Sequence, residues 1–76
     1  MDAASMQMLA VGLATGLGML GPALGIGMIG YAGLSGIARN PEAKGAIQTN
    51  MILAIAFAEA IGIYVLVLAI ILAMVA

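Results

Sequence analysis

Hydrophobic residues fill two long segments of this sequence, and nearly all charged residues lie outside them. Thirty-six uncharged residues run from Ala3 to Ala38, and the 32 residues from Gly45 to Ala76 contain one charged residue, Glu59. As a helix, the first segment would reach about 54 Å at about 1.5 Å per residue. The hydrocarbon core of a membrane is only about 30 Å thick. Each segment is therefore long enough to span it, and the first is expected to protrude and tilt.

A short polar connector separates the two segments. It contains both basic residues of the chain, Arg39 and Lys44, together with Glu42 and an Asn40-Pro41 pair that disfavours helix and promotes a turn. We therefore expect an all-α fold: one domain over residues 1–76, with a first helix at about 3–38, a polar loop at about 39–44 and a second helix at about 45–75. Basic residues favour the cytoplasmic side, which predicts a cytoplasmic loop and both termini outside.

Composition excludes most other classes of protein. With 66% hydrophobic and 7% charged residues, the chain is far from a soluble domain, in which about 25% of residues are charged. Its net charge of −1 offers no basic patch for nucleic acid. It has no cysteine and no histidine, so neither a disulfide framework nor a transition-metal site is expected. No basic residue precedes the first apolar segment, which is also too long for a signal peptide. We expect both segments to be retained in a bacterial plasma membrane.

Glycine is concentrated in the first helix, where nine of the eleven glycines precede residue 40. At about 100° per residue these glycines and nearby alanines form two stripes on opposite sides of the helix. The first small-residue stripe contains Ala14, Gly18, Gly21, Gly25, Ala32 and Gly36, and the second contains Gly12, Gly16, Ala23, Gly27 and Gly30. Small residues let membrane helices approach closely.

Two opposed stripes suit a helix with a close neighbour on each side. Contacts through two different faces are heterologous and close into a ring when the rotation allows, so we infer a homo-oligomeric ring. The helix-packing residues are expected to be Gly16, Gly18, Gly21, Gly25, Gly27 and Gly30. Two simpler interpretations stay open: a dimer through one stripe, and the general frequency of glycine in membrane helices. Pro22 predicts a modest kink in this helix.

Glu59 is the fifteenth residue of the second segment, which places it near the middle of the bilayer. A charge at that depth costs about 2.5–3.5 kcal/mol or more. The carboxyl is therefore expected to be neutral when it faces lipid and ionised beside a cation or water, as a moving proton carrier requires. Neither span contains a basic residue, so the cation must come from another subunit. The alternative is a protonated Glu59 that hydrogen-bonds between helices as a packing element.

The residues around Glu59 favour a proton over sodium as the transported ion. Sodium needs several oxygen ligands, but Phe57 and Ala60 beside Glu59 have no side-chain oxygen, and neither do Gly25 and Ile26 at nearly the same depth on the first helix. Tyr64 carries the nearest hydroxyl and is either a hydrogen-bond partner of Glu59 at a seam between helices or an ordinary membrane aromatic. We expect no cofactor and no bound metal.

Three motifs in order resemble one family, the c-subunit of F-type ATP synthases, over essentially the whole chain. The first is the glycine-rich run at residues 18–30, and the second is the polar loop Ala38-Arg39-Asn40-Pro41-Glu42. The third is Phe57-Ala58-Glu59-Ala60-Ile61-Gly62-Ile63-Tyr64, which looks like the ion-carrying segment of that family. An acidic residue in mid-span together with all three motifs makes the resemblance specific.

The resemblance implies a non-catalytic rotor subunit that assembles with copies of itself and with membrane lipid. It implies that Glu59 is the reversible proton carrier and that an arginine of the a-subunit promotes its deprotonation. It also implies that Arg39, Asn40 and Pro41 face the gamma and epsilon subunits of the central stalk. Sodium-type members carry glutamine at the position of Ile26 and serine or threonine at that of Ala60. The absence of these oxygen-bearing residues from this sequence agrees with proton transport. Asn40 stands where many members have glutamine.

The sequence does not predict the number of protomers in the ring. Pro22 and Ala23 interrupt the glycine pattern, and ring closure depends on small differences in helix packing.

The alternative function is that of a small pore-forming oligomer or of a purely structural membrane subunit. A pore predicts ion leakage by the purified assembly, whereas a rotor ring plugged by lipid is expected to be tight.

Overall fold

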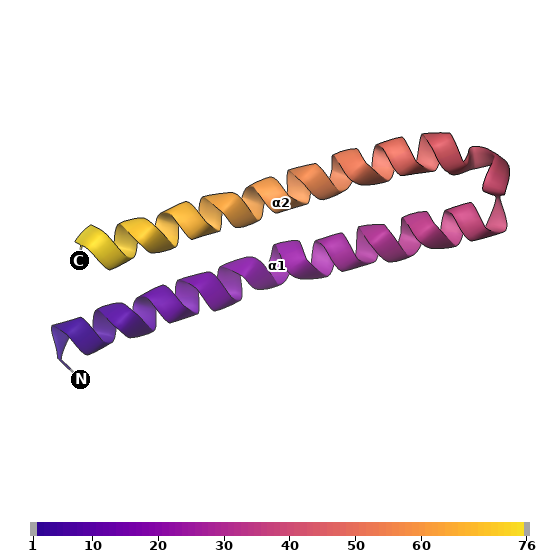
Figure 1. Cartoon of the computed structure of the whole chain (residues 1–76). Coiled ribbons are helices and arrows are strands. Elements are labelled where there is room, and N and C mark those ends of the chain that lie inside the picture. Colours follow the sequence, from indigo (N-terminus) through magenta and orange to yellow (C-terminus); the bar gives the residue numbers. More distant parts are fainter. Residues whose placement is uncertain (1, 76) are drawn as a thin grey trace.

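Two antiparallel helices joined by a tight turn make up residues 2–75 of the chain, the part that the computed structural model describes (Figure 1). Helix α1 runs from Ala3 to Arg39, the single 3-10 turn η1 from Pro41 to Ala43, and helix α2 from Lys44 to Val75. The hairpin measures 59 × 17 × 7 Å, which is longer than the hydrocarbon core of about 30 Å. The predicted two-helix hairpin is confirmed.

Asp2 begins α1 as its N-cap residue. Its backbone is extended, with φ −78° and ψ 177°, and its carboxylate accepts a hydrogen bond of 2.8 Å from the backbone N–H of Ser5. The first four N–H groups of a helix lack partners within the helix, and a side-chain oxygen at this position satisfies one of them. The helix then continues through Pro22 without interruption.

The connector is shorter than the predicted loop at residues 39–44, because Arg39 still belongs to α1 and Lys44 already belongs to α2. Asn40 takes a non-helical conformation, with φ −140° and ψ 78°, as expected for a residue before proline. Its backbone N–H nevertheless donates to the Gly36 carbonyl at 2.9 Å and closes α1. Pro41 opens η1, where its missing N–H costs nothing. The chain thus reverses with a single residue outside helical conformation.

The two helices pack along a stripe of mostly small residues that recurs every three or four positions on each. The half-buried members on α1 include Val11, Ala14, Gly18, Pro22, Gly25, Ile29, Gly33 and Gly36, and those on α2 include Ile47, Met51, Ala54, Ala58 and Val65. Within the described part of the chain, only Gly62 and Ala69 of α2 are buried. This spacing matches the period of 3.6 residues and keeps one side of each helix in contact along its length.

Most large apolar side chains lie outside this interface. Their exposed fractions range from 37% at Met19 to 80% at Met74. Within residues 2–75, both long helices are apolar enough to cross a membrane. An exposed apolar surface of this extent marks contact with lipid or with other subunits. The hairpin alone therefore leaves most of its large apolar side chains available for contact with lipid or with other subunits.

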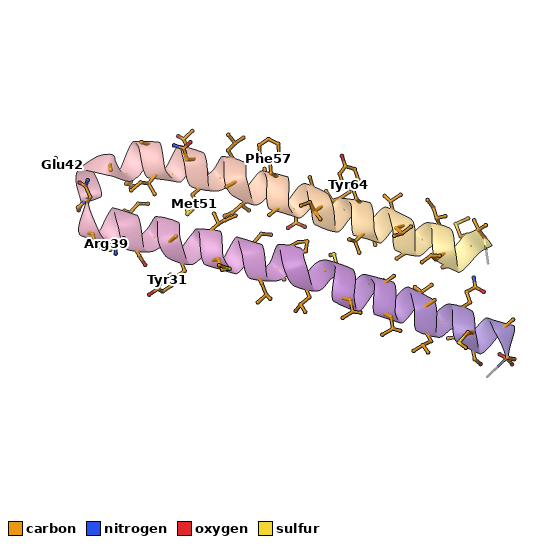
Figure 2. The ribbon with its side chains drawn as sticks, turned by 180° about the vertical axis from the view of Figure 1, so that it is seen from behind. Tyr31, Arg39, Glu42, Met51, Phe57 and Tyr64 are labelled. Carbon is orange, nitrogen blue, oxygen red and sulfur yellow. The ribbon has the colours of Figure 1, made fainter. Side chains whose placement is uncertain are left out.

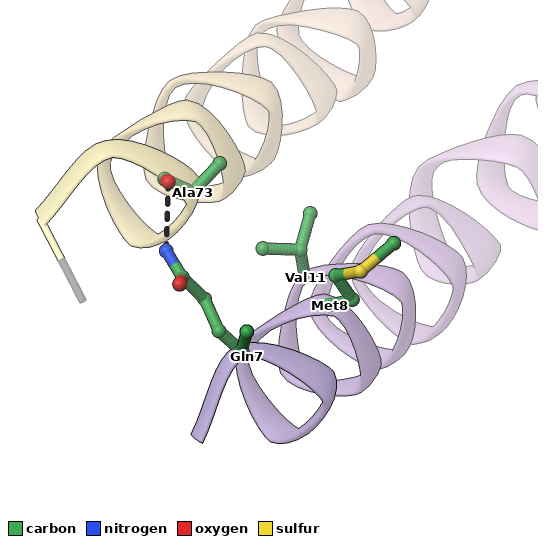
Figure 3. A pocket seen from close by; sticks show the side chains of 5 residues that line it. Gln7, Met8, Val11 and Ala73 are labelled. Atoms are coloured by element: carbon green, nitrogen blue, oxygen red, sulfur yellow. Dashed lines mark hydrogen bonds between the residues drawn. The ribbon is translucent and has the colours of Figure 1, made fainter. Parts of the chain in front are cut away.

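A hydrogen-bonded contact fastens the open end of the hairpin. The Gln7 side-chain amide donates to the carbonyls of Leu72 and Ala73, at 2.9 and 2.7 Å. Figure 3 shows the bond to Ala73 beside a shallow groove of about 350 Å³. The groove is lined by Ala4, Gln7, Met8, Val11 and Ala73. The last carbonyls of a helix have no partner within the helix. Gln7 therefore satisfies two acceptors of α2 and ties the start of one helix to the end of the other.

Candidate functional site

Glu59 lies on α2 at the edge of the helix interface. Its neighbours Ala58 and Ala60 are half-buried, whereas Glu59 itself is exposed. One carboxyl oxygen, Oε1, lies 3.8 Å from the position that a Cβ on Gly62 would occupy, one turn further along the helix. The same position is 3.3 Å from the Met19 Sδ of α1. The carboxyl is therefore folded along α2 toward Gly62, beside the thioether of Met19.

The register of the hairpin fixes the depth of this carboxyl. Gly18 faces Val65, and Gly36 faces Ile47, and the same register places Glu59 level with Leu24 and Gly25. The other charged side chains of the chain are Asp2 before α1 and three residues in or beside the turn. Of the side chains in residues 2–75, none donates a hydrogen bond to Glu59. The hairpin thus places the carboxyl next to apolar groups and, within residues 2–75, offers it no hydrogen-bond donor.

Tyr64 lies on the opposite flank of α2 from Glu59. Five residues of helix correspond to a rotation of about 140°, and Figure 2 shows Tyr64 and Phe57 both directed away from α1. Their side chains are 73% and 69% exposed. Tyr64 cannot reach Glu59 of its own chain from this position. A hydrogen bond between the two residues stays a prediction that requires two neighbouring copies.

The remaining residues predicted around the ion site are apolar and lie on both helices. Gly25, Ile26 and Ala60 are half-buried, and Phe57 is exposed. Gly25 and Ile26 belong to α1, whereas Phe57 and Ala60 flank Glu59 on α2. None of these side chains carries an oxygen, so among these residues and Glu59 only the Glu59 carboxyl supplies side-chain oxygens.

The two small-residue stripes of α1 have different surroundings. In the first stripe, a Cβ on Gly18 would lie 2.6 Å from Val65 Cγ1, and one on Gly36 would lie 3.3 Å from Ile47 Cδ1. One of the two neighbours inferred from the sequence is therefore the chain's own α2. In the second stripe, a Cβ would meet no atom of residues 2–75 within 4 Å at any of the glycines, Gly12, Gly16, Gly27 and Gly30.

Six α1 glycines are not needed by the hairpin itself. Gly21 and Gly25, like the four glycines of the second stripe, would place a Cβ in open space with respect to the described residues. A shallow apolar groove of about 510 Å³ lies over part of this surface, lined by Ala23, Leu24, Gly27, Met28, Tyr31 and Ala32. Glycine inside a helix costs about 1 kcal/mol relative to alanine. The four glycines of the second stripe therefore leave room for a close contact outside the hairpin.

The polar turn forms the exposed tip at the other end of the hairpin. Arg39, Asn40, Pro41 and Glu42 are all exposed, and Figure 2 shows Arg39 and Glu42 beside the reversal of the chain. The next polar residues of α2, Gln48, Thr49 and Asn50, are also exposed. The tip thus presents a charged and amide-bearing surface beyond the apolar part of the helices.

The sequence analysis did not identify three residues that contribute to contacts in the structure, two near Glu59 and one at the open end of the hairpin. The Met19 thioether and the Glu59 carboxyl both lie over Gly62, and Gln7 bridges the helices. The spacing of Gly62, three residues after Glu59, is a signal that helical periodicity could have provided. The contacts of Met19 and Gln7 depend on the register between the helices, which no local pattern contains.

Comparisons with known proteins agree with this geometry. The model of the ATP synthase c-subunit family matches residues 9–72. Over all of its 76 residues, and over the whole of the relative, the chain is 55% identical to a protein of Dehalococcoides mccartyi that is named as an ATP synthase c-subunit. It is 47% identical over 66 residues to a protein of the same name from Prochlorococcus marinus, a match that covers 87% of this chain and 82% of that relative.

Proposed function

The chain belongs to the ATP synthase c-subunit family, and we propose that it carries protons through the membrane on Glu59. Members of this family are structural rotor components of the ATP synthase complex and assemble as rings of helical hairpins. The observation that carries the proposal is the placement of a single carboxyl within the two spans, among apolar groups and without an internal partner.

The energetic argument rests on the difference between the two forms of the carboxyl. A charge at the centre of the bilayer costs about 2.5–3.5 kcal/mol or more, which corresponds to roughly 100-fold in population. An ionised Glu59 is therefore held where a cation or water compensates it, and only the protonated form enters lipid. Successive copies that release and take up protons beside a fixed cation then turn the ring, in the direction that the proton gradient across the membrane sets.

Proton transport rather than sodium transport fits the donor set. Gly25, Ile26 and Ala60 supply no side-chain oxygen, and a hard cation such as sodium prefers several oxygen ligands. A proton needs only the carboxyl itself. The Tyr64 hydroxyl of a neighbouring copy is the candidate donor that would hold the protonated carboxyl in place.

The partners follow from the surfaces of the hairpin. Membership of the family makes the chain part of the ATP synthase complex in the plasma membrane. We place an arginine of the a-subunit opposite Glu59, lipid on the apolar flanks, and the gamma and epsilon subunits against Arg39, Asn40 and Pro41. With the basic residues at the tip, the turn is cytoplasmic and both termini are outside.

Replacing Glu59 by glutamine tests the carrier role. Glu59→Gln keeps the size of the side chain but cannot release a proton, so ATP-driven proton pumping by the reconstituted complex should be lost while the ring still assembles. Asp2→Asn is the matched control, because Asp2 is an exposed acid before α1, away from the turn, and asparagine also caps helix starts; this variant should pump normally. Normal pumping by the Glu59→Gln complex would exclude the proposal.

Labelling with a hydrophobic carbodiimide tests the identity of the ion. The reagent modifies protonated carboxyls in apolar surroundings, so the assembled ring should be modified at Glu59, faster at low pH and equally with and without sodium. Mass spectrometry of the labelled chain provides the readout. Protection of Glu59 by sodium would show that the ligand argument from Ile26 and Ala60 is wrong.

A further inference from the structure

Gly62 is one of two buried residues in the described part of the chain, and it lies one helical turn after Glu59. A Cβ at this position would lie 3.3 Å from the Met19 Sδ, 3.6 Å from the Met19 Cε and 3.8 Å from the Glu59 Oε1. The space above Gly62 is therefore shared by the thioether of one helix and the carboxyl of the other. The proposed proton carrier and an apolar side chain of α1 thus approach each other over a glycine.

The distances predict a graded response to bulk at this position. The 3.8 Å to the carboxyl oxygen is an ordinary van der Waals separation, whereas the 3.3 Å to the sulfur is tighter than usual. Alanine would first push the flexible Met19 thioether by a few tenths of an ångström. A branched side chain would need the space that the Glu59 carboxyl itself occupies, because β-branched residues have few rotamers.

On the basis of the proposed function of Glu59, we propose that Gly62 is a positioning residue. Because Gly62 has no side chain, the Glu59 carboxyl can lie over it, on the side where the Met19 thioether also lies. We call this space over Gly62 the seat of the carboxyl. The seat holds the carboxyl along α2 at the edge of the interface. Bulk at residue 62 turns it outward onto the exposed flank of the helix, where Ile63 and Leu66 are also exposed.

Packing rather than charge governs this seat. Asp2, Arg39, Glu42 and Lys44 lie at or beyond the helix ends, and the phenol of Tyr64 is on the opposite flank of α2. On α1, the contact over Gly62 is made by Met19, which has no titratable group. Substitution of Gly62 or Met19 therefore changes the space around the carboxyl without changing the charge near it.

Carbodiimide labelling of the assembled ring measures access to the carboxyl. At a pH where Glu59 is protonated, the Gly62→Val ring should be labelled at Glu59 several-fold faster than the ring of the original sequence. The labelling rate of Gly62→Ala should lie between these two rates. The infrared carbonyl band of protonated Glu59 should shift in Gly62→Val. Combining Gly62→Val with Met19→Ala should return labelling toward the original rate, because the valine then fills the space that the thioether leaves.

A matched control separates positioning from general disturbance of the interface. Ala69 is buried in the same interface, ten residues from Glu59. Ala69→Val adds bulk of the same kind and should change neither the labelling rate nor the infrared band. Equal labelling of Gly62→Val and Ala69→Val would overturn the proposal. Should Gly62→Val not assemble, labelling of Gly62→Ala at the original rate would overturn it.

The outcomes for the carrier role are distinct. An unmodified ring that is not labelled at Glu59, together with normal pumping by Glu59→Gln, would exclude the proposed function. A ring that is labelled at Glu59 in a pH-dependent manner, with no response to Gly62→Val, would leave that function standing and exclude only the seat at Gly62.

Discussion

At the scale of single residues, two acids of this chain have opposite surroundings. Asp2 is exposed at the start of α1, where the Ser5 backbone N–H and then the Ser5 side chain hydrogen-bond to its carboxylate and lower its pKa below the ordinary value of 3.8. Glu59 lies among apolar side chains and receives no such bond from residues 2–75. The first acid stabilises a helix end in its charged form, and the second is the proposed proton carrier.

Stability of the first turn of α1 should depend on pH through Asp2. Since the pKa of Asp2 is lower in the folded chain than its ordinary value, the capping contribution is complete above about pH 3.8 and is lost as pH falls through the lowered folded value. Protection of the Ser5 and Met6 amides against hydrogen exchange, corrected for intrinsic rates, should fall in that acid range. Asp2→Ala should lower this protection at neutral pH and remove its dependence on pH. Unaltered protection in that variant would contradict the capping role.

Residue type and position are enough to identify Glu59 as a candidate functional residue from the sequence, because a lone acid in an apolar span has few purely structural explanations. The immediate neighbours of its carboxyl are not predictable in the same way. Met19 contacts the site from forty residues away in the sequence, and its contribution depends on how far α1 slides along α2. The sequence leaves Tyr64 open between two roles, and the structure excludes only the contact within one chain.

At the scale of elements, the hairpin depends on small residues where α1 meets α2. Gly18 is the tightest example, since a Cβ there would lie 2.6 Å from Val65 Cγ1 and 3.0 Å from Val65 Cγ2. Gly33 faces the Met51 thioether in a similar way, but that side chain is long and flexible. The stiff β-branched valine cannot move aside as methionine can.

Gly18→Ala should therefore destabilise the ring, by about 1–3 kcal/mol as is typical of overpacked sites. Gly33→Ala should cost less, because Met51 can change rotamer. The second substitution Val65→Ala should restore most of the loss in Gly18→Ala. The thermal dissociation of the purified ring measures all three effects. A Gly18→Ala ring as stable as the original, with no response to Val65→Ala, would contradict this packing.

The sequence predicts both helices and the turn between them, and it misses only the extent of the turn. Charged residues favour a loop in the sequence, although Arg39 and Lys44 lie in the terminal turns of α1 and α2, where their side chains reach solvent while the backbone stays helical. The two stripes of small residues are also predictable. Which stripe faces α2 is not, because the two are equivalent on a helical wheel until the turn sets the orientation.

At the scale of the whole molecule, a single hairpin leaves most of its apolar surface uncovered. Met28, Leu24 and Tyr31 rim a groove over Gly27, and their exposed fractions are 72%, 60% and 79%. Family membership accounts for this surface through ring assembly. The number of copies in the ring depends on angles between hairpins, which neither the sequence nor one hairpin determines.

Gly25→Leu should disturb the closure of the ring. Within the described residues nothing lies within 4 Å of a Cβ at this position, but Gly25 is half-buried in the stripe of α1 that packs on α2, so a side chain as large as leucine should change the helix packing on which the ring depends. Native mass spectrometry should show fewer closed rings or a changed number of copies. Gly45→Leu is the control, because Gly45 has equally open surroundings in residues 2–75 but lies beside the turn. A ring of unchanged size and yield in Gly25→Leu would contradict the packing argument.

The bond between Gln7 and the end of α2 also orders events during biosynthesis. The chain is made from its N-terminus, so the Gln7 amide exists before its acceptors, the carbonyls of Leu72 and Ala73, have been synthesised. An unpaired amide in hydrocarbon is costly, and until those acceptors arrive the amide must stay hydrated near the membrane surface. This contact therefore closes only after Leu72 and Ala73 have been synthesised, late in the folding of the nascent chain.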